Sequence, residues 1–148
     1  MTIKEYPEEK LNKLNTEYKG ISMNNIDPRG IKNVNFSLGK ETDEREPEWK
    51  AQRLTRGFDD TELWSLDCTI TKFIAPRLKV FKEQAAQIGD HPVNITSEKW
   101  QEILSQMIEG FELYPDHFNW SAEDSDANWK KVDKALSLFH KWFFKLWN

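Results

Sequence analysis

Cysteine, histidine and glycine are scarce in this sequence, and each shortage excludes a class of site. Among 148 residues there is one cysteine, Cys68, so the chain forms no internal disulfide and no cysteine-rich zinc site. Three histidines leave little material for a catalytic triad or a three-histidine metal centre. The six glycines form no phosphate-cradling loop, and neither His-Glu-x-x-His nor Gly-x-Ser-x-Gly occurs. We therefore predict no catalytic residues, no metal ligands and no cofactor.

Long apolar runs and an excess of basic charge are also missing. No apolar run reaches the roughly 18–20 residues that span a bilayer, and the start of the chain, from Met1 to Glu5, is too polar for a signal peptide. The formal net charge is −4, with acids and bases mixed along the chain, whereas binding to nucleic acid needs a clustered basic surface. We expect a cytoplasmic protein that binds neither membranes nor double-stranded DNA.

What the sequence does contain is typical of a globular helical protein. Aromatic residues make up 13% and charged residues 31% of the chain, and the length suits a single domain over residues 1–148. Two short helices are expected, one from Pro7 to Gly20 and one from Pro47 to about Leu54, which Gly57 ends. Between them, residues 21–46 are polar and predict an extended arm.

Three longer segments repeat apolar residues at helical spacing. The first runs from Asp59, which forms a capping box with Glu62, to Gly89, and we expect Pro76 to kink or break it. The second begins after Thr96 and the third near Asp126. Their predicted buried stripes are Leu63, Leu66, Ile70, Phe73, Ile74, Leu78, Phe81, Ala85 and Ile88; Trp100, Ile103, Leu104, Met107, Ile108 and Phe111; and Trp129, Val132, Leu136, Phe139, Phe143 and Leu146. The fold class is mainly α: a small bundle of three substantial and two shorter helices with an extended N-terminal arm.

Charged side chains fall inside two of these stripes. Asp67 and Arg77 project onto the apolar face of the first long helix, and Asp133 and His140 onto that of the last. A charged group is rarely buried without a partner, so these residues are either structural ion pairs or the lining of a polar pocket between helices. On this basis, loss of Asp67 is expected to destabilise the protein more than loss of the cap Asp59. The candidate ligand-binding residues are Asp60, Trp64, Asp67, Thr71, Arg77, Asp133 and His140.

The C-terminal turns are aromatic on every side. A helix that is apolar all round is buried, and a chain end in a small protein has little of its own chain to cover it. We therefore predict a homo-oligomer whose interface includes Trp142, Phe143, Phe144 and Trp147.

Two stretches resemble a group of small uncharacterised proteins encoded by tailed bacteriophages and prophages. The first is Arg56-Gly57-Phe58-Asp59-Asp60 with Leu63-Trp64-Ser65-Leu66-Asp67, and it continues to Pro76-Arg77-Leu78-Lys79; the second runs from Thr96 through Trp100 to Gly110-Phe111-Glu112. The match covers about Arg56 to Leu113. The resemblance implies a phage protein acting in the bacterial cytoplasm, and it implies no mechanism.

Two functional interpretations stay open at this point. The first is a non-enzymatic binding protein that serves counter-defence, either by sequestering a nucleotide immune signal or by blocking a host protein. In the nucleotide version Arg77 contacts phosphate and Trp64 stacks on the base. The alternative is a small carboxylate-based metal-dependent hydrolase, with a minor structural virion protein as a further option. We favour binding because histidine and glutamate are poorly placed for catalysis.

Overall fold

The computed structural model describes residues 37–147, and within this range every regular element is helical. The α-helices are α3 (Glu46–Arg56), α4 (Thr61–Trp64), α5 (Leu66–Ile88), α6 (Ser97–Leu113) and α7 (Ala122–Trp142), and two 3₁₀ helices follow as η2 (Tyr114–Asn119) and η3 (Phe143–Lys145). The mainly helical fold is thereby confirmed. Most of the arm expected over 21–46 and the whole of the first short helix lie outside the described residues.

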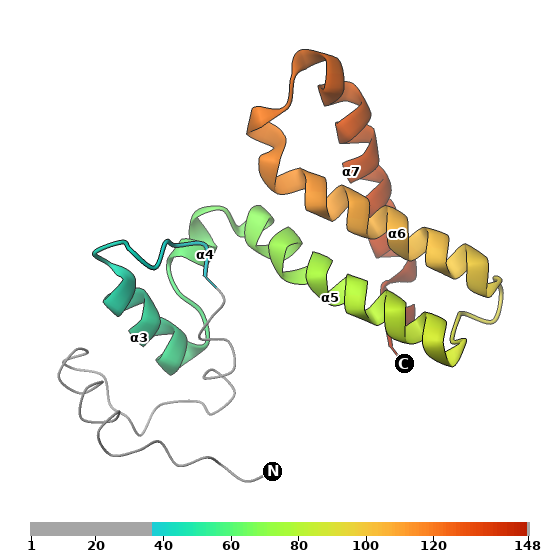
Figure 1. The fold of residues 1–148 in the computed structure, drawn as a ribbon, viewed down its shortest axis with the longest axis horizontal. Coiled ribbons are helices and arrows are strands. Elements are labelled where there is room, and N and C mark those ends of the chain that lie inside the picture. Colours follow the sequence, from blue (N-terminus) through green and yellow to red (C-terminus); the bar gives the residue numbers. More distant parts are fainter. Residues whose placement is uncertain (1–36, 148) are drawn as a thin grey trace, which may run out of the picture. The chain divides into compact units, whose positions relative to one another are not determined.

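Within the described residues the chain divides into two compact units, with the boundary between Leu66 and Asp67 (Figure 1). In the first unit, α3 begins with acidic residues and Pro47, and it ends at Gly57, whose φ of 87° is the left-handed conformation that glycine adopts without strain. The helix predicted from Pro47 is therefore confirmed. Its buried side is formed by Trp49, Ala51, Arg53 and Leu54.

The helix expected from Asp59 to Gly89 is interrupted at Ser65. That residue has φ −136° and ψ 77°, which separates the single turn of α4 from α5. By contrast, α5 continues without interruption through Pro76, so the alternative of a break at the proline is wrong.

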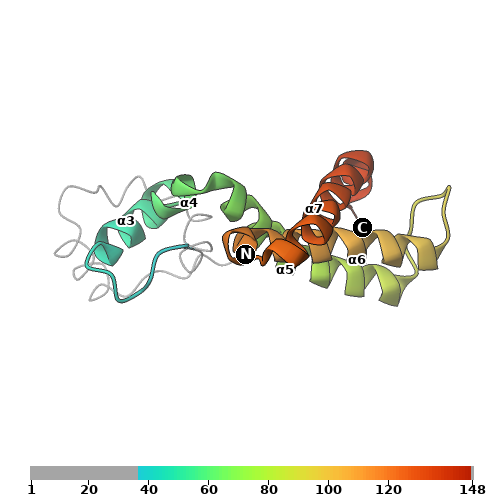
Figure 2. The same cartoon turned by 90° about the horizontal axis from the view of Figure 1, so that it is seen from above.

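In the second unit, α5 and α6 run side by side and α7 crosses α6 (Figures 1 and 2). The hydroxyl of Thr96 accepts a hydrogen bond from the Lys99 backbone N–H at 3.1 Å, which confirms the predicted cap of α6. The last helix begins earlier than expected, because Ser121 caps it by accepting from the Asp124 N–H at 3.2 Å.

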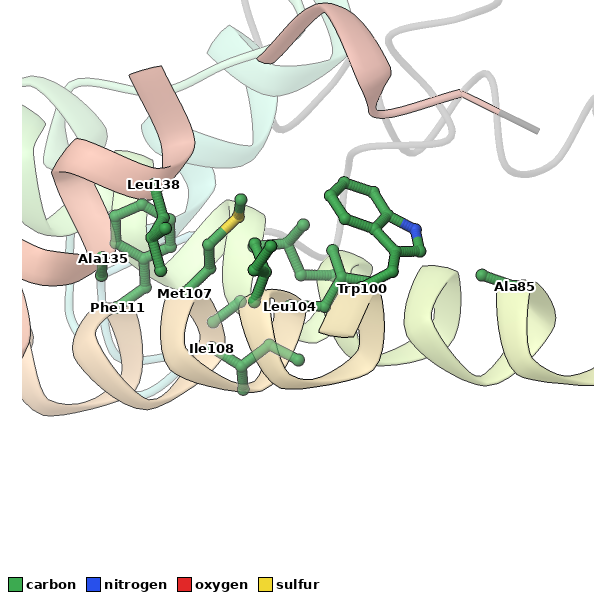
Figure 3. Packing of buried hydrophobic residues seen from close by; sticks show 11 residues of the cluster. Ala85, Trp100, Leu104, Met107, Ile108, Phe111, Ala135 and Leu138 are labelled. Carbon is green, nitrogen blue, oxygen red and sulfur yellow. The ribbon is translucent and has the colours of Figure 1, made fainter. Parts of the chain in front are cut away.

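One apolar core holds the second unit together. All six residues of the α6 stripe are buried as predicted, and Met107 and Phe111 lie against Ala135 and Leu138 of α7 (Figure 3). The remaining core members are Ala75, Leu78, Ala85, Trp100, Ile103, Leu104 and Ile108. The rings of Trp100 and Trp142 meet edge to face with centroids 5.6 Å apart.

Gly110 allows α6 and α7 to cross closely. A Cβ built at this position would lie 2.4 Å from the Cβ of Ala135 and 2.6 Å from the carbonyl oxygen of Lys131. Only glycine fits at this distance, so the crossing depends on a residue with no side chain.

Candidate functional site

The charged residues predicted to be buried are exposed instead. Asp67, Arg77, Asp133 and His140 all lie on the surface of the second unit, so the predicted buried polar cluster is wrong. The physical reason is that α5 and α7 each have one side in the core, and these four residues lie on other sides of their helices. The buried residues of α5 are Cys68, Thr71, Ala75, Leu78 and Ala85.

Asp67 binds a residue that the sequence analysis did not single out. Its carboxylate accepts a hydrogen bond from the phenol of Tyr114, which lies 47 positions later at the start of η2. This hydrogen bond lowers the pKa of Asp67, and it raises the pKa of Tyr114 to about 12. The pair ties the start of α5 to the end of α6.

The contacts of Arg77 within the described residues lie in its own helix. Its Nη1 donates to the carbonyl of Phe73 at 2.8 Å, and its guanidinium lies 3.5 Å from the centroid of the Phe73 ring. No ion pair joins Arg77 to another residue of the described part of the chain.

The other predicted ligand residues are dispersed. Thr71 is buried, and its hydroxyl donates to the backbone carbonyl of Cys68 at 3.0 Å. Asp60 and Trp64 belong to the first unit. Asp60 accepts hydrogen bonds from Gln52 and Arg56, and Trp64 meets the ring of Trp49 edge to face. Each of these three residues therefore has a structural partner.

A buried ionic network in the first unit centres on Arg53. Its guanidinium contacts Asp59 and Glu46, each at 2.5 Å, and the side chain of Asp59 has no exposed surface. The carboxylate of Asp59 also accepts from the backbone N–H of Thr61 at 2.9 Å, while Glu62 accepts from the backbone N–H of Asp59 at 2.6 Å. Glu62 thus contacts Asp59 as the predicted capping box requires, whereas the carboxylate of Asp59 binds the N–H of Thr61, one residue before Glu62.

Burial and hydrogen bonding act against each other on this network. Burial raises the pKa of Asp59, but hydrogen bonds from Thr61, Ser37 and Arg53 outweigh it and leave this pKa lowered. For Glu62 burial dominates and raises the pKa. Sequence reasoning identified the cap and missed Arg53, although its position four residues after the buried Trp49 places both on one face of α3.

Aromatic rings gather where η2 leads into α7. The ring of His117 stacks on Tyr114 with centroids 4.8 Å apart and lies 5.5 Å from Trp129, and Trp129 meets Trp120 at 5.2 Å. These distances are ring-to-ring contacts, so the aromatic side chains fill the space between them. The cluster fixes the turn between α6 and α7.

The outward faces of α5 and α7 each carry a stripe in which apolar residues alternate with charged or polar ones. On α5 we define the α5 outer stripe as Phe73, Arg77, Val80 and Gln84, and on α7 the α7 outer stripe as Trp129, Asp133, Leu136 and His140; all eight residues are exposed. Val80 and Leu136 expose 52% and 51% of their surface. Each stripe repeats at four, three and four residues, which keeps its members on one side of a helix.

The aromatic C-terminus divides into a buried and an exposed part. Trp142 is half-buried and packs against the core cluster, and its predicted place in an interface stays a prediction. Phe143, Phe144 and Trp147 are exposed by 54%, 83% and 68%; we call these three residues the C-terminal aromatic surface. The indole N–H of Trp147 donates to the Phe144 carbonyl at 3.0 Å, which holds this turn together. Solvent-exposed aromatic residues in such a group are typical of a protein-binding surface.

A surface groove of about 550 Å³ lies between α5 and α6. It is lined by Lys79, Lys82, Glu83, Ser105, Ile108, Glu109, Glu112 and Leu113. Lys79 pairs with Glu112, and Glu109 pairs with Lys131 at 2.8 Å. Most charged side chains that line the groove therefore already form ion pairs within the protein.

No group of three or more histidine, cysteine, aspartate or glutamate side chains between residues 37 and 147 is placed to hold a metal ion, so Asp67, Asp133 and His140 do not combine. Likewise, no helix in this range is long and apolar enough to cross a membrane.

Comparison with known proteins found no relative. No protein-family model, no curated protein and no solved structure matches the chain. The resemblance to phage proteins therefore stays a prediction.

Proposed function

We propose that this chain is a non-enzymatic binding protein that docks on another protein through its C-terminal aromatic surface. The observation that carries the proposal is the exposure of Phe143, Phe144 and Trp147 beside one another at the end of α7 and in the turns that follow. Removing such side chains from water on binding is favourable by about 25 cal/mol per Å² of apolar area. Exposed polar aromatics such as tryptophan are also frequent hot spots in interfaces.

The proposed target is a host protein in the bacterial cytoplasm, and the proposed purpose is counter-defence. Both come from the resemblance of Arg56 to Leu113 to phage-encoded proteins. Cations at Lys141 and Lys145 lie next to the C-terminal aromatic surface in the sequence, and they favour a partner with acidic groups around an apolar centre. We also propose that the protein is a homo-oligomer.

The nucleotide version of this function has weaker support. Trp64 and Arg77, which were to hold the base and the phosphate, belong to different units. Arg77 already lies on the Phe73 ring and donates to a backbone carbonyl. For the hydrolase alternative, the described residues supply no group of three side chains placed to hold a metal ion, and for a virion role they supply no specific observation.

The proposal is tested with one surface variant and one matched control. Phe144→Glu with Trp147→Glu removes two exposed aromatics and adds two negative charges, while Ala122→Glu with Ala127→Glu adds the same charge at exposed positions of α7. Each tagged protein is incubated with bacterial lysate, and the captured proteins are identified by mass spectrometry. The expected result is a host protein that wild type and control retain and the aromatic variant loses.

Reconstitution with the purified partner then separates binding from catalysis. A stable complex with both chains chemically unchanged supports the proposal. Modification of the partner at more than one equivalent per chain overturns it, and so does equal capture by the aromatic variant.

A further inference from the structure

The outer stripes of α5 and α7 match each other in spacing and complement each other in charge. Both repeat apolar, charged, apolar and polar residues at intervals of four, three and four positions. Aligned in parallel from their first members, they pair Phe73 with Trp129, Arg77 with Asp133, Val80 with Leu136, and Gln84 with His140. This interval is the a/d repeat by which two helices pack side by side.

The charged layer is the most specific part of this match. Each stripe carries one charged residue within its apolar run, positive on α5 and negative on α7, at the same point of the repeat. Among the described residues Arg77 has no carboxylate partner, and Asp133 has neither a hydrogen bond nor an ion pair. An Arg–Asp contact between helices would supply charge-assisted hydrogen bonds to both groups. A polar layer between apolar layers also sets register and partner choice.

We propose that the α5 outer stripe of one copy of this chain packs in parallel on the α7 outer stripe of a second copy, with Arg77 bound to Asp133 across the interface. The inference rests on the proposed homo-oligomer and names its surfaces. Phe73 and Trp129 form an aromatic layer at one end of the contact, and Gln84 and His140 form a hydrogen-bonding layer at the other. A pair of copies related by a two-fold axis forms this contact twice.

A mixing experiment with two charge reversals tests the register directly. Arg77→Asp places two aspartates in the charged layer, and Asp133→Arg places two arginines there, so each variant alone is repelled from its own copies. When the two variants are mixed, each contact again joins opposite charges. Both substitutions are at exposed positions, and association on mixing shows that both variants are folded.

Native mass by light scattering is the measurement. We expect at least two chains for wild type, one chain for each single variant, and recovery of the wild-type mass in the equimolar mixture and in the double variant. Lys72→Asp and Glu123→Arg, exposed reversals outside the stripes, are the controls and are expected to keep the wild-type mass.

Three outcomes overturn the inference. If wild type is a single chain, there is no self-association to explain. If wild type is an oligomer and both variants keep its mass, the oligomer is held elsewhere: the inference fails while the proposed oligomer stands. If the variants dissociate but do not associate on mixing, the Arg77–Asp133 register is wrong. Capture of a host protein through Phe144 and Trp147 is measured separately and decides the proposed function on its own.

Discussion

The guanidinium of Arg53 lies 2.5 Å from the carboxylate of Asp59, and both side chains are withdrawn from solvent. Arg53 lies in the last turn of α3, and Asp59 lies in the loop between α3 and α4, so their contact holds that loop against the helix. Glu46 approaches the same guanidinium from the start of α3. One buried cation thus joins both ends of α3 to the residue that caps α4.

Loss of Asp59 is therefore expected to be severely destabilising. Asp59→Ala leaves Arg53 buried with a single partner, and breaking a buried pair in this way costs about 3–5 kcal/mol. Asp67→Ala removes an exposed hydrogen bond and is expected to cost less, which reverses the order that the sequence alone predicts. Urea denaturation of both variants measures the difference, and hydrogen exchange of α3 localises it.

The neighbouring variant Asp60→Ala is the control for this comparison. Asp60 forms a half-exposed ion pair with Arg56, and surface pairs contribute little to stability. Equal unfolding midpoints for Asp59→Ala and Asp60→Ala would contradict a dominant role for the buried pair.

Acid is expected to weaken the first unit through Asp59. Its pKa is lowered in the folded state, so its contribution is complete above the unfolded pKa of about 3.9 and is lost as the pH falls through the folded pKa. Glu62 acts in the opposite direction, because burial raises its pKa and protonation then favours the folded state. Hydrogen exchange of α3 followed from neutral pH to below pH 4 measures the sum of both effects.

Two variants assign these opposing effects. Asp59→Asn is expected to reduce the loss of stability in the most acidic range. Glu62→Gln is expected to remove the gain in stability that protonation of Glu62 gives on acidification, which begins at a higher pH than the loss through Asp59. An acid profile that Asp59→Asn leaves unchanged would show that another group controls it.

The phenol of Tyr114 is expected to lose its proton at a higher pH than an ordinary tyrosine. Its hydrogen bond to Asp67 is the main cause that raises its pKa to about 12, so the bond stabilises the fold below the usual tyrosine pKa of about 10 and is lost between about pH 10 and 12. Phenolate absorbance followed against pH measures this, with Tyr114→Phe to identify the signal. In Asp67→Ala the same signal is expected to move toward pH 10; an unmoved signal would mean that Asp67 is not the cause.

Local signals in the sequence predict much of this fold. Thr96 caps the start of α6, and Gly57 ends α3 in the left-handed conformation. Glu62 accepts the hydrogen bond from the backbone of Asp59 that their spacing predicts. The α6 stripe is buried in full because a continuous helix between two others keeps its phase. The apolar spacing does not reveal the interruption at Ser65. It also does not reveal that only the side of α5 with Ala75, Leu78 and Ala85 enters the core, which leaves Asp67 and Arg77 exposed.

The candidate site was harder to predict for a related reason. Spacing alone places Asp133 and His140 on one side of α7 together with Trp129 and Leu136, and this grouping is correct. It does not tell whether that side faces the core or solvent, because the helix also carries a second apolar side at Val132, Ala135 and Leu138. One of these two sides packs in the core, and the other is exposed.

The α6–α7 crossing offers a final prediction at Gly110. Replacement by alanine should favour helix formation by about 1 kcal/mol, but the new methyl group would meet the Ala135 side chain and the Lys131 carbonyl inside contact distance. The carbonyl belongs to the backbone of α7, so the helix itself has to move, and overpacking of this kind costs about 1–3 kcal/mol. Gly110→Ala is therefore expected to lower stability, while Ser105→Ala, at an exposed position of the same helix, leaves it unchanged or slightly higher. Thermal unfolding of the three proteins measures this, and a Gly110→Ala variant more stable than wild type would mean that α6 and α7 cross at a greater distance.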